Sequence, residues 1–121
     1  MSVGDDNSLV FRGAWGAVRY ATQANGKMLA DEFIGDLDDS DQRKLGALFE
    51  RMAEHGQIRN EVKFKKVFGH IFEFKSFQIR IGCFQVGRTW FLTHGFVKKQ
   101  AKWPKPEIER ARRIQMEHLQ R

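Results

Sequence analysis

The stretch from Ile71 to Lys102 constrains the fold more than any other part of this chain. Apolar and polar residues alternate along it, which is the two-residue period of strands whose successive side chains point to opposite faces of a sheet. Breaks at Ser76 and at residues 86–88 divide the stretch into three segments. We therefore predict three consecutive antiparallel strands joined by tight turns, with a core on one face and cations on the other.

The alternation also assigns individual side chains to faces. Arg80 falls on the polar face of the second strand beside Gly82, where a small residue leaves room for another molecule to approach. The third strand, residues 89–97, is apolar on both faces, so we predict a central strand. His94 lies among its large apolar residues, and two interpretations stay open: a hydrogen-bonded core histidine, or a catalytic or substrate-contacting residue.

The sequence pattern of the N-terminal half predicts one strand followed by two helices. Residues 15–22 read as a strand, to which residues 9–11 add an extension. Apolar residues then recur at helical spacing over residues 29–37 and 45–52, and the acidic run 38–41 suits the start of the second helix. We interpret these two segments as a helical hairpin that ends at Gly56.

The remaining segments complete the predicted fold. Residues 57–70 have a weak pattern and are interpreted as a connector, either a loop or a short helical turn. Pro106 and the acidic residues after it favour a final amphipathic helix. The predicted class is α+β, a small, mostly antiparallel sheet with an N-terminal helical hairpin and a C-terminal helix.

The length of 121 residues indicates one domain, residues 1–121, with residues 1–8 expected to be disordered. The chain has a single cysteine, no apolar run of membrane-spanning length, and no basic segment followed by an apolar block at its N-terminus. We therefore expect a cytoplasmic protein that does not associate with a membrane.

Charge is distributed unevenly along the chain. The net charge of +6 is the balance of −4 in residues 1–56 and +10 in residues 57–121, which include the predicted strands. A field of this kind favours polyanionic partners, so nucleic acid is the first class of partner to consider, the alternative being a surface that only promotes solubility.

Several classes of enzyme do not fit the sequence. The glycines are scattered rather than spaced as in a phosphate-binding loop. The four histidines lie far apart and Cys83 alternates with apolar residues, so neither a metal site nor a cysteine nucleophile is expected, and we expect no cofactor. RNA, however, carries its own nucleophile, because its 2′-hydroxyl can attack the neighbouring phosphate when a base removes the proton and cations stabilise the transition state. Arg80 is the best candidate for holding that phosphate, since arginine binds phosphate oxygens through two parallel bonds.

The ordered set of segments resembles a known family. A strand, two helical segments, IFEFKSFQIRIGCF and then WFLTHGFVKKQAKWPKPEIERARR are similar to the phage-derived, HigB-like branch of the RelE/ParE toxin superfamily, over about residues 15–119. The resemblance implies the toxin of a type II toxin–antitoxin pair, an endoribonuclease that cleaves mRNA on the ribosome without a metal. It also implies a cognate helix-turn-helix antitoxin as partner, besides the ribosome and mRNA.

The resemblance also implies roles for individual residues. Lys75 and Arg80 match basic strand residues of the RNA-cleaving members, and Lys98 and Lys99 match the basic residues after their last strand. Glu73 stands where some of those members have a basic residue, and no tyrosine matches the C-terminal one that some members use. We expect catalytic roles for Arg80, Lys75, Lys99 and His94, and RNA binding by Lys98, Lys102, Lys65 and Lys66.

Two alternatives share the same fold. ParE-like members inhibit DNA gyrase instead of cleaving RNA, and here the helical hairpin and basic surface would dock on that protein. The second alternative is a phage-derived domain that binds a partner but has lost activity. The identity of the proton-transferring group, His94, His70, His118 or a lysine, stays open as well.

Overall fold

The computed structural model describes residues 6–120. Along the chain it contains a 3-10 turn (Asp6–Ser8), β1 (Leu9–Arg12), β2 (Ala17–Tyr20), α1 (Leu29–Gly35), α2 (Asp39–His55), β3 (Phe64–Phe68), β4 (Ile71–Ser76), β5 (Ile79–Val86), β6 (Thr89–Val97) and α3 (Lys105–Leu119). Of the residues expected to be disordered, 1–5 lie outside the described part, whereas Asp6–Ser8 form the turn. No helix within residues 6–120 is both long enough and apolar enough to cross a membrane.

The six strands form one mixed sheet in the order β1-β2-β6-β5-β4-β3. β4, β5 and β6 form the antiparallel meander predicted from the alternation in residues 71–102. The prediction of a small, mostly antiparallel sheet is nevertheless wrong, because β2 runs parallel to β6 in the middle of the sheet and β3 extends its far edge. β3 was interpreted as a connector. As an edge strand it has one side open to solvent, so its lysines obscure the alternation.

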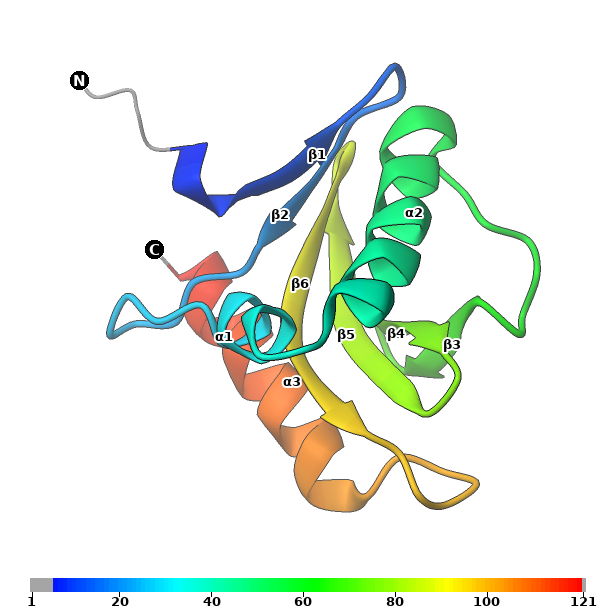
Figure 1. Ribbon diagram of the computed structural model, residues 1–121. Coiled ribbons are helices and arrows are strands. Elements are labelled where there is room, and N and C mark those ends of the chain that lie inside the picture. The colour runs from blue at the N-terminus through cyan, green and yellow to red at the C-terminus, as the bar shows by residue number, and fades with distance from the viewer. Residues whose placement is uncertain (1–5, 121) are drawn as a thin grey trace.

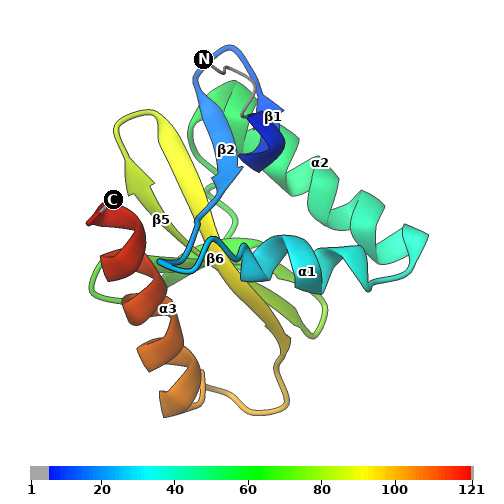
Figure 2. The ribbon, with the colours of Figure 1, turned by 90° about the vertical axis from the view of Figure 1, so that its left-hand side faces the viewer.

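The helices cover both faces of the sheet (Figure 2). α1 packs on β6, α2 packs on β1, β2 and β4, and α3 lies against β5 and β6 on the opposite face. The predicted N-terminal helical hairpin is therefore wrong: α1 is seen nearly end-on in Figure 1 while α2 runs lengthwise, and each helix packs on the sheet. The apolar face of each helix packs on strands of the sheet and not on the other helix. Helical periodicity predicts that a helix has an apolar face, but it does not show whether that face packs on a sheet or on another helix.

The residues at the two ends of α2 cap the helix as the sequence predicts. The carboxylate of Asp38 accepts a hydrogen bond from the amide of Asp41 at 2.8 Å, which caps the N-terminus of the helix. Gly56 ends the helix with a φ of 79°, in the left-handed region that favours glycine. Because both ends of α2 are determined locally, the helix presents a fixed apolar face to the sheet. On this face the ring of Phe49 packs edge to face on the ring of Phe74 in β4, with centroids 5.0 Å apart.

Two hydrophobic clusters occupy the two faces of the sheet. The first lies under α1 and α2 and includes Phe74, Ile81 and Leu92. The second lies under α3 and includes Ile71, Phe84, Phe96, Trp103, Ala111 and Ile114. Alternate residues of β4 and β5 thus face opposite clusters, as the alternation predicts, and the polar face of these strands is the face that α3 covers in part.

A bulge between β5 and β6 changes the faces of β6. Two steps along β5, from Ile81 to Cys83, lie opposite three steps along β6, from Gly95 to Leu92. As a result Leu92 belongs to the cluster under α2, whereas Phe96, four residues on, belongs to the cluster under α3. Strict alternation along residues 89–97 predicts Leu92 and Phe96 on one face; this is wrong, because the bulge shifts the alternation by one residue.

Candidate functional site

Basic residues gather where β4 ends, β5 begins and β6 ends. Lys75 of β4 is the cross-strand partner of Arg80 in β5, and Arg80 is in turn opposite Phe96 of β6. The amide of Lys98 donates to the carbonyl of Gln78 at 2.7 Å, which continues the pairing beyond the strand. Because residues two apart on a strand share a face, Lys75, Arg80 and Lys98 lie on the α3 side of the sheet.

A buried carboxylate lies among these cations. Glu73 is paired with Lys65 of β3 on one side and Gly82 of β5 on the other, and it is 1% exposed. Its Oε1 accepts a hydrogen bond from the indole of Trp103 at 2.7 Å and lies 3.4 Å from Nε of Arg80. A carboxylate is buried at low cost only when it is paired and hydrogen-bonded, as it is here.

The guanidinium of Arg80 is held in place by the protein. One terminal nitrogen donates to the carbonyls of Phe77 and of Ile79, the latter at 3.0 Å, and the side chain is 13% exposed. Its Nε lies at ion-pair distance from Glu73 but makes no hydrogen bond of good geometry. Arg80 is therefore oriented before any ligand binds, which lowers the entropic cost of binding an anion.

A cleft of about 320 Å³ opens beside this cluster. Glu73 and Trp103 contribute to its wall, with Val67 and Ile108 as apolar neighbours. The four residues for which we predicted RNA binding all line it: Lys65, Lys66, Lys98 and Lys102. Residues from β3, from the end of β6 and from the segment leading to α3 thus meet in one basic cleft.

The lysines of the cluster have altered acidity. Burial lowers the pKa of Lys75 and of Lys98, Glu73 opposes this shift, and the neighbouring cations Lys65 and Arg80 add to it. A lysine with a lowered pKa releases its proton more readily at neutral pH, so either residue is suited to proton transfer as well as to charge stabilisation.

None of the four residues with predicted catalytic roles lines the cleft: Arg80 and Lys75 lie on the adjoining strands β5 and β4, and Lys99 and His94 lie elsewhere. Lys99 is exposed in the segment after β6 and does not line the cleft. His94 is 2% exposed; its Nδ1 lies 3.1 Å from the hydroxyl of Thr93 and its Nε2 lies 3.0 Å from the carboxylate of Glu107 in α3.

The surroundings of His94 keep its ring neutral. Burial, together with the charges of Arg110 and Arg113, lowers its pKa to about 3, although the nearby Glu107 carboxylate favours the protonated form. A neutral ring satisfies both contacts if Nε2 donates to Glu107 and Nδ1 accepts from Thr93. The arrangement corresponds to the core interpretation of His94, in which the ring joins the sheet to α3.

Sequence reasoning did not identify Glu73 and Trp103 as parts of a site. Glu73 shares its strand face with Ile71 and Lys75, the face that the alternation assigns to the cations, so the pattern did not mark it as buried. Trp103 carried no signal either. It reaches Glu73 from the irregular segment between β6 and α3, and its ring also stands edge to face on Phe96 with centroids 4.8 Å apart.

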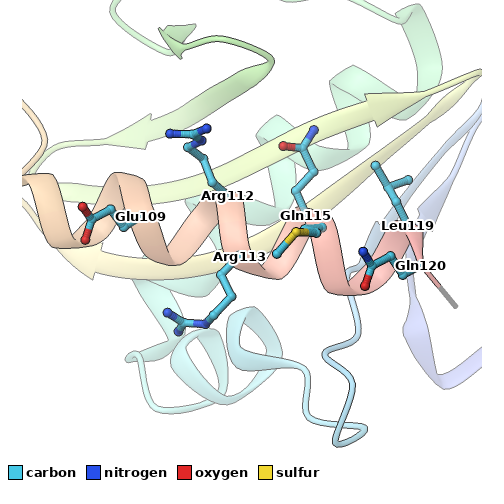
Figure 3. Close-up of a pocket in the computed structure, with 7 residues that line it drawn as sticks. Glu109, Arg112, Arg113, Gln115, Leu119 and Gln120 are labelled. Atoms are coloured by element: carbon cyan, nitrogen blue, oxygen red, sulfur yellow. The ribbon is translucent and has the colours of Figure 1, made fainter.

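A second and larger hollow, of about 590 Å³, runs along α3 (Figure 3). It is lined by Glu109, Arg112, Arg113, Gln115, Met116, Leu119 and Gln120, and by none of the predicted site residues. Figure 3 shows Arg112 and Arg113 pointing to opposite sides of the helix. The hollow therefore lacks the converging polar groups that characterise a binding site.

Residues 6–120 contain no cluster of three or more histidine, cysteine or acidic side chains placed to hold a metal. Cys83 is fully buried, and burial raises the pKa of its thiol well above the usual value, so it is not a nucleophile at neutral pH. The groups available for chemistry in the cleft are cations, one carboxylate and one indole.

Comparison with models of known protein families yields a match. A family model described as phage derived protein Gp49-like (DUF891) matches residues 32–115, about two-thirds of the chain. The matched region runs from α1 into α3 and includes every strand that contributes to the cleft. No curated protein matches the sequence significantly.

Proposed function

The chain belongs to the phage-derived Gp49-like family, and on that premise we propose that it is the toxin of a toxin–antitoxin pair that cleaves mRNA on the ribosome. The membership is consistent with the resemblance to HigB-like toxins of the RelE/ParE superfamily. The cleavage activity, the ribosome and mRNA as targets and a helix-turn-helix antitoxin as partner are parts of the proposal.

One observation carries the proposal: on one face of the sheet, an oriented arginine lies beside a cleft that several lysines line. Arg80, Lys75 and Lys98 lie on neighbouring strands, and Lys65, Lys66 and Lys102 bring further positive charge to the cleft. Electrostatic stabilisation of a phosphorane-like transition state requires cations that are in position before the reaction. Phosphodiester cleavage within RNA needs no other catalyst than such cations and a group that moves the proton.

In the proposed reaction the 2′-oxygen of a nucleotide attacks the adjacent phosphorus while the bond from phosphorus to the 5′-oxygen breaks. A base takes the proton of the 2′-hydroxyl, and an acid gives a proton to the departing 5′-oxygen. The products are a 2′,3′-cyclic phosphate and a 5′-hydroxyl. Arg80 holds the non-bridging phosphate oxygens, and Lys75 and Lys98, with Lys99 from the adjoining segment, stabilise the developing charge.

Proton transfer is assigned to a lysine rather than to His94. Lys75 and Lys98 have lowered pKa values and lie beside Arg80, which favours exchange of a proton with a group bound at that arginine. His94 is buried, and its two ring nitrogens face Thr93 and Glu107. Its proposed part is to fix α3 against the sheet and so to keep the cleft in shape.

The proposal is tested with purified protein, translating ribosomes and a defined mRNA in the presence of a metal chelator that spares ribosome integrity. Cleavage should appear on ribosome-bound mRNA, with 5′-hydroxyl and cyclic phosphate ends, and Arg80→Ala should lose most of it. Uncut mRNA with the wild-type protein would contradict the proposal and would favour the domain that has lost activity. The gyrase alternative, in which the helical segments and the basic surface dock on that protein, predicts supercoiling defects without RNA cleavage.

The proposed antitoxin is tested at the neighbouring reading frame. A small helix-turn-helix protein encoded there should bind this chain and restore growth when the two are produced together. Absence of such a frame, or a product that neither binds nor protects, would contradict the toxin–antitoxin part while leaving RNA cleavage open to its own test.

A further inference from the structure

Phe77 in the turn between β4 and β5 has an unusual backbone conformation and an unusual exposure. Its φ is 55°, and among residues 6–120 it is the only residue other than glycine with a positive φ. Two-residue hairpin turns favour glycine at such positions because a side chain there is strained. The ring is nevertheless 75% exposed. The chain thus places a large aromatic group at the surface, in a conformation that costs free energy and without the compensation of burial.

Two cations adjoin this ring or its backbone. Arg80 donates a hydrogen bond to the carbonyl of Phe77, which ties the turn to the proposed phosphate-binding group. On the other side, Nζ of Lys44 in α2 lies 4.7 Å from the centre of the ring. At this one residue a positive φ, an exposed side chain and a carbonyl that accepts from Arg80 occur together. Strained residues of this kind cluster at functional sites.

We propose that Phe77 is a stacking platform for an RNA base next to the phosphate held by Arg80. The inference rests on the proposed function and adds to it a contact for the base. Aromatic rings bind unpaired bases by stacking, which tolerates different sequences, and flanking cations bind the backbone. A protein partner that covered the ring would also bury the exposed ammonium of Lys44 beside it, which is unfavourable without a counter-charge. Nucleic acid supplies a phosphate for it.

The chain offers a matched control in Phe68 at the opposite end of the neighbouring edge strand. Phe68 is also exposed, at 49%, and also has a cation over its ring, with the guanidinium of Arg112 at 5.3 Å. It differs in having an ordinary strand conformation and no bond to Arg80. Phe77→Leu therefore removes a ring beside the proposed site, and Phe68→Leu removes a comparable ring that has no link to it.

The experiment measures binding of a labelled single-stranded oligoadenylate by fluorescence anisotropy. Phe77→Leu should weaken binding about 5- to 150-fold, the range for one stacked base. Phe77→Tyr should bind as the wild type does, because it keeps the ring and the same backbone strain, and Phe68→Leu should bind normally. An abasic oligonucleotide of the same length, which has the phosphates but no bases, should bind wild type and Phe77→Leu equally.

The outcomes separate this inference from the proposed function. If Phe77→Leu binds oligoadenylate as well as the wild type while Arg80→Ala does not, stacking is refuted and RNA recognition by the cleft stands. If Phe77→Leu binds the abasic oligonucleotide more weakly than the wild type by the same factor, the ring affects the geometry of the site and does not contact a base. That result also refutes the inference. A wild-type protein that binds neither oligonucleotide refutes stacking by Phe77 and leaves ribosome-dependent cleavage to its own test. Loss of antitoxin binding alone in Phe77→Leu refutes the inference and assigns the ring to a protein contact instead.

Discussion

Replacing Glu73 by glutamine should destabilise the protein and strengthen its binding of polyanions. Glutamine has almost the same shape and still offers an oxygen to the indole of Trp103, which now donates to the carboxylate at 2.7 Å. What it removes is the negative charge beside Arg80, Lys75 and Lys98. The substitution therefore isolates the electrostatic role of this carboxylate from its packing and from its bond to the indole.

The magnitude follows from the geometry. At the observed 3.4 Å between Oε1 of Glu73 and Nε of Arg80, the gross attraction is about 5 kcal/mol for an effective dielectric constant of about 20. Breaking a buried ion pair costs about 3–5 kcal/mol because a charge is left without its partner. Arg80 keeps two carbonyl acceptors and is 13% exposed, so the lower end applies. We expect the free energy of unfolding to fall by about 3 kcal/mol.

Urea denaturation measures this change, with an unaltered dependence on denaturant as the sign that the unfolded state is the same. Glu109→Gln, at an exposed position of α3, is the matched control and should stay within about 0.5 kcal/mol of the wild type. Binding of the abasic oligonucleotide should increase in Glu73→Gln as the cluster gains net positive charge. A Glu73→Gln protein as stable as the control, with unchanged oligonucleotide affinity, would refute the idea that Glu73 neutralises the cluster.

Two further predictions concern Trp103, which is bonded to this carboxylate, and the buried ring of His94. Trp103→Phe keeps the ring against Phe96 but removes the indole donor to Glu73, and we expect a loss of about 1–3 kcal/mol in urea denaturation; an unchanged midpoint would contradict the bond's importance. Because burial lowers the pKa of His94 to about 3, below its unfolded value, the unfolded state binds the extra proton on acidification. Stability should therefore fall by up to about 1.4 kcal/mol per pH unit as the pH drops from about 6.5 towards 3, and His94→Gln should flatten that slope; equal slopes in both proteins would contradict a neutral buried ring.

The alternation in residues 71–102 was enough to locate β4, β5 and β6 and to place Lys75 and Arg80 on one face, because a covered strand face leaves a two-residue pattern. Charge and the family resemblance then selected Lys65, Lys66, Lys98 and Lys102, which the structure brings to one cleft. The prediction of the strands succeeded because it depends on local periodicity alone, whereas RNA binding by the four lysines stays a prediction.

The parts that the sequence did not predict depend on contacts between distant segments. The parallel pairing of β2 with β6 leaves no local pattern, because a strand's alternation is the same for either direction of its neighbour. The bulge in β6 that turns His94 toward α3 changes the register without a marker residue. The bond from Trp103 to Glu73 spans thirty residues of sequence, so neither residue reveals the other.

Mapping of mRNA ends in bacteria that produce the protein tests most directly the proposal that it cleaves mRNA. Production of the wild type should halt growth and create new 5′-hydroxyl ends within translated regions, whereas Arg80→Ala, shown by denaturation to be folded, should create few or none. Phe68→Leu should cleave as the wild type does. Intact mRNA in cells that contain the folded wild-type protein, or equal cleavage by wild type and Arg80→Ala, would contradict the account.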